Sequence, residues 1–151
     1  MDKSELVSDG KLVVESQIYG SFNGFNGGKL FPLYNGQYWI QATYMYWYYY
    51  SYMPHVKIYQ YGGKHYITIN GLEQFIEVRR ITDVMKATIV SDFNGWTGDT
   101  IFELDNGQVW KQAEYDYDYN YSYRPDALIY ANGYGHTLVV EGNSVAVTRI
   151  K

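Results

Sequence analysis

The three histidines are the side chains in this sequence best suited to acid–base or metal chemistry, and their spacing favours neither. His65 and His136 each follow closely on a glycine turn, and His55 belongs to no motif. No Ser-His-Asp arrangement accompanies them, and a zinc site needs three or four clustered ligands. The absence of cysteine excludes disulfides, thiolate metal sites and cysteine nucleophiles. We therefore predict that the chain is not an enzyme and has no metal site and no cofactor.

Two other segments begin like ligand-binding loops and then depart from the pattern. The DxDxN run at 116–120 opens like a calcium loop, but Tyr121 and Ala127 stand where glycine and glutamate are required. The glycine-rich segment 22–29 ends in Lys29, yet a phosphate-binding loop needs serine or threonine next and a helix after it. We interpret the first as a solvent-facing strand and the second as an ordinary loop.

Nineteen tyrosines make the chain unusually aromatic, and ten of them alternate along two segments. In a strand, side chains at positions i and i+2 share one face, so each segment has a tyrosine face and an opposite face. In the second segment the opposite face carries carboxylates, which are costly to bury unpaired. We therefore predict that both tyrosine faces point into the core. The tyrosines are Tyr44, Tyr46, Tyr48, Tyr50 and Tyr52, then Tyr115, Tyr117, Tyr119, Tyr121 and Tyr123.

The opposite face of the first segment carries Met45, Trp47, Tyr49 and Met53 instead of carboxylates. If it faces solvent, it forms an exposed apolar patch, and such patches mark interaction surfaces. We predict that it binds a protein partner or a second copy of the chain, since interfaces are enriched in Trp, Tyr and Met. The alternative is that the second half or the N-terminal segment of the same chain covers it.

An internal repeat organises the chain. At an offset of 71 residues, segment 22–71 aligns without a gap to segment 93–142, and 24 of the 50 pairs are identical. We expect an N-terminal segment (1–15), a first copy (16–81), a linker (82–86) and a second copy (87–151).

Turn signals and β-branched runs within each copy predict an all-β fold. Asn35-Gly36 and Asn106-Gly107 are strong hairpin signals, which we assign to type I′ turns. Strands are expected over 29–33, 37–52, 56–59, 66–69 and 75–78, and no window carries helical periodicity. Five or six strands in so short a copy predict a tandem duplication of a small SH3-like barrel, because closure removes exposed strand edges.

Charge divides along the same boundary. Residues 16–81 carry five basic and two acidic groups, whereas residues 87–150 carry three basic and nine acidic groups, within a net charge of −4. A basic, aromatic copy is an alternative site for single-stranded nucleic acid or another polyanion. The acidic copy opposes such binding, so this is the second choice. The residues available for polyanion contact are Lys29, Lys57, Lys64, Arg79 and Arg80.

Aromatic side chains also suit sugar rings, which gives a third candidate function. Trp39 and Trp110 recur with flanking glutamines, but a tryptophan kept in both copies is more simply a core residue. Phe25 and Trp96, at equivalent positions of the glycine-rich loop, are better candidates for an exposed ligand contact.

The chain resembles a group of short bacterial proteins. The resemblance rests on segment 105–112, the alternating tyrosines, Arg124-Pro125 and segment 139–142. The resemblance covers the second copy almost completely and the first more loosely, where Met53 replaces the arginine before proline. It implies a β-barrel repeat of bacterial cytosolic origin and carries no activity over. The first residues lack the basic and apolar regions of a secretory signal, which also favours the cytoplasm. No apolar stretch is long enough to span a membrane, so we expect no membrane partner.

Overall fold

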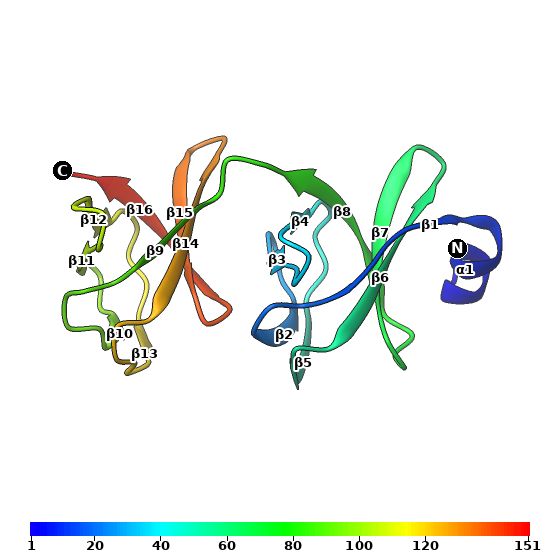
Figure 1. The fold of residues 1–151 in the computed structure, drawn as a ribbon, viewed down its shortest axis with the longest axis horizontal. Helices are drawn as coiled ribbons and strands as arrows, with labels where there is room; N and C mark the ends of the chain where they lie inside the picture. The colour runs from blue at the N-terminus through cyan, green and yellow to red at the C-terminus, as the bar shows by residue number, and fades with distance from the viewer. The chain divides into compact units, whose positions relative to one another are not determined.

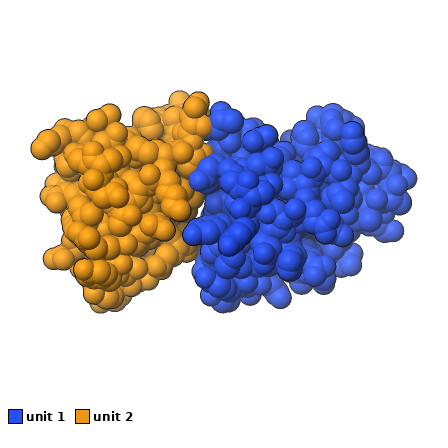
Figure 2. Space-filling view, viewed as in Figure 1, with its two compact units in different colours: residues 1–82 blue, residues 83–151 orange.

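The computed structural model describes all residues, Met1–Lys151, and divides into two compact units. The first unit is Met1–Thr82 and the second is Asp83–Lys151 (Figure 2). Apart from one short helix, both units consist of antiparallel strands. The prediction of an all-β fold is confirmed.

The first unit contains helix α1 (Lys3–Asp9), a six-stranded sheet and a separate two-stranded sheet (Figure 1). The six-stranded order is β1-β6-β7-β8-β4-β3, and β2 pairs with β5 in the smaller sheet. The strands are β1 (Lys11–Gln17), β2 (Ser21–Phe25), β3 (Leu30–Pro32), β4 (Tyr38–Gln41), β5 (Trp47–Tyr52), β6 (His55–Tyr61), β7 (Lys64–Ile69) and β8 (Phe75–Ile81).

The second unit has the same strand order as the first. Its six-stranded sheet runs β9-β14-β15-β16-β12-β11, and β10 pairs with β13 in a two-stranded sheet. The strands are β9 (Met85–Thr88), β10 (Gly95–Trp96), β11 (Ile101–Glu103), β12 (Val109–Gln112), β13 (Asp118–Tyr119), β14 (Asp126–Asn132), β15 (Gly135–Val140) and β16 (Asn143–Arg149).

Each unit has its own hydrophobic core, built from equivalent positions. Phe22, Phe31 and Trp39 lie in the first core, and Phe93, Phe102 and Trp110 lie in the second. Valine and isoleucine from the long hairpins fill the space between these rings. The alternating tyrosines belong to neither core.

The Asn-Gly hairpins are present, but their turns are not of type I′. Only the glycine of each pair has a positive φ, 88° at both Gly36 and Gly107. The N–H of Gly36 donates to the carbonyl of Leu33 over 3.0 Å, and the side chain of Asn35 accepts from the N–H of Gln37. This is a three-residue loop in which one residue adopts the left-handed conformation, and glycine supplies it at little cost.

Several local elements differ from the sequence prediction, and one is strand β1 (Lys11–Gln17), which runs across the boundary expected between segments 1–15 and 16–81. The run expected over 37–52 is interrupted between β4 and β5, and the glycine-rich segment at 22–29 contributes strand β2. Helix α1 was not expected; Asp2 caps it by accepting from the N–H of Glu5, and its buried Leu6 faces the protein. Seven residues are too few to show helical periodicity in a sequence.

Candidate binding surface

The ten alternating tyrosines lie on the surface, so the prediction that they face the core is wrong. Their exposed fractions range from 57% for Tyr50 to 81% for Tyr115. Each core is already filled by residues of the six-stranded sheet and of β2 or β10, and each tyrosine segment lies in or next to the two-stranded sheet that β2 or β10 forms. The face opposite the tyrosines therefore contacts the protein, and the phenol hydroxyls remain in water.

In the first unit the inward face is apolar and centred on Trp47. Its ring lies 5.1 Å from the ring of Phe25 and 6.2 Å from that of Phe22, and it stacks on Tyr49 at 5.4 Å with an interplanar angle of 7°. Trp47 and Met53 are half-buried, while Met45 and Tyr49 are exposed by 36% and 40%. The predicted surface of Met45, Trp47, Tyr49 and Met53 is therefore partly covered by its own unit.

In the second unit the same face is polar and hydrogen-bonded. Asp116 accepts from the indole N–H of Trp96 over 3.2 Å. The side chains of Asn120 and Ser122 donate to the carboxylate of Glu141 over 3.3 and 3.0 Å. The prediction that this polar face is fully solvated is therefore wrong, because Asp116, Asn120 and Ser122 find hydrogen-bond partners within the unit.

Phe25 and Trp96 are buried, each with 2% of its surface exposed, so the expectation that they contact a ligand is wrong. They occupy equivalent positions on β2 and β10 and pack on Phe22 and Phe93 respectively. Their glycine-rich surroundings predicted a loop, but the segments pair as strands and turn both rings inward.

Two glycines bring the tyrosine segments against β2 and β10. A Cβ atom at Gly24 would lie 2.0 Å from the carbonyl oxygen of Trp47, and one at Gly95 would lie 1.8 Å from that of Asp118. Both glycines also have a positive φ, 94° and 87°. Any larger residue would push the strands apart, so Phe-Asn-Gly recurs in both copies because of this close approach.

Two buried glutamines shape the loops that lead into the tyrosine segments. The amide nitrogen of Gln41 donates to the carbonyls of Asn26, Thr43 and Met45, and its oxygen accepts from the N–H of Asn26. Gln112 donates to the carbonyls of Glu114 and Asp116 and accepts from the N–H groups of Gly98 and Thr100. These amides flank Trp39 and Trp110, for which a core position was preferred over a sugar contact, and they bind backbone groups of their own unit. Glutamine stands at this position in both copies, and this recurrence is the feature of the sequence that indicates a structural role.

The residues predicted to contact a polyanion are spread over several elements. Lys29 precedes β3, Lys57 lies on β6, Lys64 on β7, and Arg79 and Arg80 on β8. Lys64 pairs with Glu77 at 3.7 Å. Lys29 is half-buried, and desolvation lowers the pKa of its ammonium from 10.5 to about 8. These positions do not form a strip along the tyrosine segment.

The two equivalent histidines pack on tryptophans. The ring centres of His65 and Trp39 are 5.3 Å apart, and those of His136 and Trp110 are 5.0 Å apart. The indole N–H of each tryptophan donates to a glutamine two residues earlier, over 3.1 Å to Gln37 and 3.0 Å to Gln108. No group of three or more His, Cys, Asp or Glu side chains is arranged to bind a metal ion.

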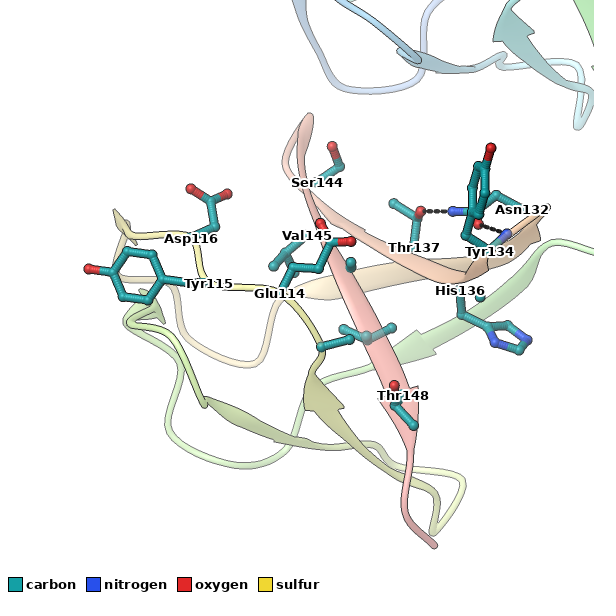
Figure 3. Close-up of a pocket in the computed structure, with 14 residues that line it drawn as sticks. Glu114, Tyr115, Asp116, Asn132, Tyr134, His136, Thr137, Ser144, Val145 and Thr148 are labelled. Carbon is teal, nitrogen blue, oxygen red and sulfur yellow. Dashed lines mark hydrogen bonds between the residues drawn. The ribbon is translucent and has the colours of Figure 1, made fainter.

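A cleft of about 480 Å³ opens in the second unit (Figure 3). Glu114, Tyr115 and Asp116 border it on one side, and the β14–β15 hairpin with Asn132 and Tyr134 borders it on the other. Asn132 donates to the hydroxyl of Thr137 over 2.8 Å and accepts from the N–H of Tyr134. The cleft thus adjoins the first residues of the second tyrosine segment.

No protein family, curated protein or solved structure matches this chain. Its single helix has seven residues, and no helix has the length and hydropathy that a membrane crossing requires. The candidate site is therefore defined by its geometry alone. We name the two surfaces the first tyrosine face (Tyr44–Tyr52) and the second tyrosine face (Tyr115–Tyr123).

Proposed function

We propose that this chain is a non-catalytic binding or assembly module that acts through its tyrosine faces. The observation that carries the proposal is the exposure of five alternating tyrosines in each unit, from 57% to 81%. Tyrosine offers a large, rigid contact area with a polar hydroxyl and loses little conformational entropy on binding. A protein partner, or a second copy of the chain, is the ligand that this chemistry fits best.

The size of each face supports this proposal. Since a fully buried tyrosine contributes about 200 Å², five tyrosines exposed by two-thirds offer roughly 700 Å². The largest apolar patch on a typical monomer measures about 300–600 Å², and larger patches mark interaction sites. The first face is the stronger candidate, because segment 44–53 contains no charged residue and has Met45 and Tyr49 exposed beside it.

The proposal also includes the duplicated barrel, the absence of catalysis and the bacterial cytoplasmic origin that the sequence led us to expect. We infer that the two units are copies of one SH3-like barrel, supported by the 24 identical pairs and the matching strand orders. The packing of His65 and His136 on tryptophans favours a structural role for them over a catalytic one. The resemblance to short bacterial proteins supports a cytoplasmic protein of bacterial origin.

The test uses a phage-displayed random peptide library selected on the full chain. One variant replaces Tyr48, Tyr50 and Tyr52 by serine, and the matched control replaces Tyr119, Tyr121 and Tyr123. We expect enriched peptides whose affinity falls at least about tenfold in one variant and holds in high salt, because the contacts are apolar. Circular dichroism verifies that both variants are folded. If no peptide is enriched, or if neither variant weakens binding, the proposal is wrong.

A polyanion is the competing ligand, and its binding is measured on the same tyrosine variants. Single-stranded oligothymidylate would bind with an affinity that falls steeply with salt, because counterions are released. A further variant replaces Lys57, Arg79 and Arg80 by alanine. If this variant loses oligothymidylate binding and the tyrosine variants keep it, nucleic acid is favoured over a protein partner.

A carbohydrate is the second candidate ligand, favoured by the cleft beside the second tyrosine face. Its volume of about 480 Å³ is typical of small-ligand sites, and Glu114, Asn132 and Thr137 line it with polar groups. Calorimetric titration with cellohexaose and maltohexaose tests this function. Binding that is lost in Tyr115→Ala and kept in Tyr44→Ala, the equivalent change in the first unit, would support it. Absence of heat with both sugars would count against it.

A further inference from the structure

We propose that the cleft of the second unit binds an arginine or lysine side chain of a basic protein partner. This inference rests on the proposed function and names the chemistry of a partner for the second tyrosine face. The cleft volume of about 480 Å³ lies in the range of ligand sites, and the cleft adjoins that face at Tyr115 (Figure 3). Two carboxylates line it, those of Glu114 and Asp116, and no lysine or arginine does. A cationic side chain is therefore the ligand that complements its charge.

A difference in side-chain size opens this cleft. In the first unit, the rings of Tyr66 on β7 and Phe75 on β8 pack edge to face, with their centres 6.0 Å apart. The strands β15 and β16 pair in the same register as β7 and β8, and they carry Thr137 and Ser144 at the equivalent positions. Both of these residues line the cleft. A small hydroxyl side chain in place of each ring leaves space on the outer side of the sheet.

The charges at this place also differ between the two units. In the first unit, the ammonium of Lys64 pairs with the carboxylate of Glu77 over 3.7 Å. Gly135 and Ala146 replace this ion pair in the second unit, and a threonine replaces Arg79. The first unit thus holds cations of its own chain at positions where the second unit has an open cleft.

The two carboxylates of the cleft come from the start of the second tyrosine segment, where the first unit has threonine and methionine. One oxygen of Asp116 accepts from the indole N–H of Trp96 over 3.2 Å, and the other accepts from the N–H of Tyr117 over 2.9 Å. These bonds fix the carboxylate, and each oxygen can still accept a second bond from a ligand. Glu114 is exposed, and its carboxylate has no partner in the chain. The site therefore combines one fixed acceptor with one free acceptor.

The same residues favour an organic cation over a metal ion or a neutral sugar. No three His, Asp or Glu side chains are arranged to bind a metal, and calcium takes six to eight oxygen ligands. On the opposite wall, Asn132 already bonds to the hydroxyl of Thr137 over 2.8 Å, so fewer of its polar groups remain for a sugar. Tyr134 is exposed on that wall, and the face of a phenol ring attracts a cation.

We expect this binding to be weak and sensitive to salt. Ion pairs at exposed carboxylates contribute little energy each and are screened as the ionic strength rises. A peptide with a single arginine should therefore dissociate in the millimolar range. This salt dependence distinguishes the cleft from the apolar contacts of the tyrosine faces, which hold in high salt.

Amide NMR spectra of the full chain at low ionic strength test the proposal with an acetylated Gly-Ser-Gly-Arg-Gly-Ser-Gly peptide. An analogue with citrulline in place of arginine has nearly the same shape without the charge. We expect saturable shifts of the amides of 113–116 and 132–137, and an affinity at least about fivefold lower for the citrulline analogue. Added salt should weaken binding of the arginine peptide. The equivalent amides of the first unit, 42–45 and 61–66, provide the internal control and should not shift.

Three variants distinguish the cleft from a general attraction to the acidic unit. Glu114→Gln removes a carboxylate of the cleft, and the matched control Glu103→Gln removes an exposed one on β11. Thr137→Tyr combined with Ser144→Phe restores the rings of the first unit and fills the cleft. We expect affinity for the arginine peptide to fall at least about threefold in Glu114→Gln and to be lost in the filled variant. Glu103→Gln should bind like the unmodified chain, and thermal unfolding verifies that all three variants are folded.

Several outcomes would overturn the inference. They are the absence of shifts in 113–116 and 132–137, equal binding of the citrulline analogue, and an unchanged affinity in Glu114→Gln. Shifts of these amides with cellohexaose and none with the arginine peptide would assign the cleft to a sugar instead. In each of these cases, peptides selected on a tyrosine face would leave the proposed function standing. A selection that enriches no peptide, while the arginine peptide binds the cleft, would contradict the proposed function and still support the cation site.

Discussion

The indole nitrogen of Trp96 lies 3.2 Å from a carboxylate oxygen of Asp116 and donates a hydrogen bond to it. At the equivalent place in the first unit, the smaller Phe25 packs against the ring of Trp47 at 5.1 Å. Each two-stranded sheet therefore contributes one tryptophan to this place. In the second unit it is Trp96 on the first strand of the sheet, β10, and in the first unit it is Trp47 on the second strand, β5. This exchange turns the inward face of the tyrosine segment from apolar to acidic.

Asp116→Ala should destabilise the second unit. The indole N–H of Trp96 is buried, and leaving a buried donor without an acceptor costs about 1–3 kcal/mol. The free energy of unfolding in urea measures the effect. Asp118→Ala is the matched control, because it removes a carboxylate from the same face of the same segment. Equal losses in both variants would show that the bond to Trp96 contributes nothing.

Gly24→Ala should separate the first tyrosine segment from β2. Its Cβ would lie 2.0 Å from the carbonyl oxygen of Trp47, so the backbone must shift as well as adopt an unfavourable φ. Gly36→Ala is the control, since Gly36 also has a positive φ but no atom within 4 Å of the added Cβ.

We expect Gly36→Ala to cost about 1 kcal/mol, the conformational term alone, and Gly24→Ala to cost at least about 2 kcal/mol more. Hydrogen exchange of the β5 amides should also accelerate in Gly24→Ala. A loss of stability no larger than that of Gly36→Ala would mean that the close approach is relieved by a small movement.

Gln112→Leu should loosen the loop that leads into the second tyrosine segment. It removes two donated and two accepted hydrogen bonds while keeping a side chain of similar size. The half-buried carbonyls and N–H groups lose this partner, so a loss of about 1–3 kcal/mol in the free energy of unfolding is expected. Amide exchange across 113–117 and urea unfolding measure it, with Gln60→Leu at an exposed position as the control. Unchanged exchange would assign the loop's order to other contacts.

The sequence was sufficient to predict the all-β class and most strands of the two large sheets. β-branched runs and turn glycines are local signals, and Phe75–Ile81 and Lys64–Ile69 lie close to the ranges expected from them. The break between β4 and β5 was not predictable in this way. There the amide of Gln41 donates to the carbonyls of Thr43 and Met45 within the loop and to that of Asn26, which is distant in the sequence, and hydrogen bonds of this kind leave no mark in the pattern of residue types.

The orientation of the tyrosines could not be predicted from alternation alone. Alternation establishes that two faces differ, but the contacts of each face decide which one points inward. The acidic face was assigned to solvent because its partners, Trp96 and Glu141, are distant in the sequence. The amphipathic character of tyrosine then permits exposure at positions where leucine or phenylalanine would be costly. The exposed surface is consequently larger than the patch of Met45, Trp47 and Tyr49 inferred first.

Lys29 should make the stability of the first unit depend on pH above neutrality. Desolvation lowers the pKa of its ammonium from 10.5 to about 8 in the folded chain, so the folded chain releases this proton before the unfolded chain does. Below pH 8 the charge is retained in both states, and its burial opposes folding. Between about 8 and 10.5 the unfolded chain binds more protons, so stability rises with pH through this window.

The measurement compares the free energy of urea unfolding of the unmodified chain with that of Lys29→Met at several values between pH 7 and pH 10. Tyrosine ionisation near the upper limit affects both chains and cancels in the difference. The unmodified chain should gain stability relative to the variant as the pH rises, while Lys57→Met, at an exposed position, controls for the loss of one positive charge. A difference between the unmodified chain and Lys29→Met that stays constant over this range would show that the ammonium of Lys29 is solvated in the folded chain.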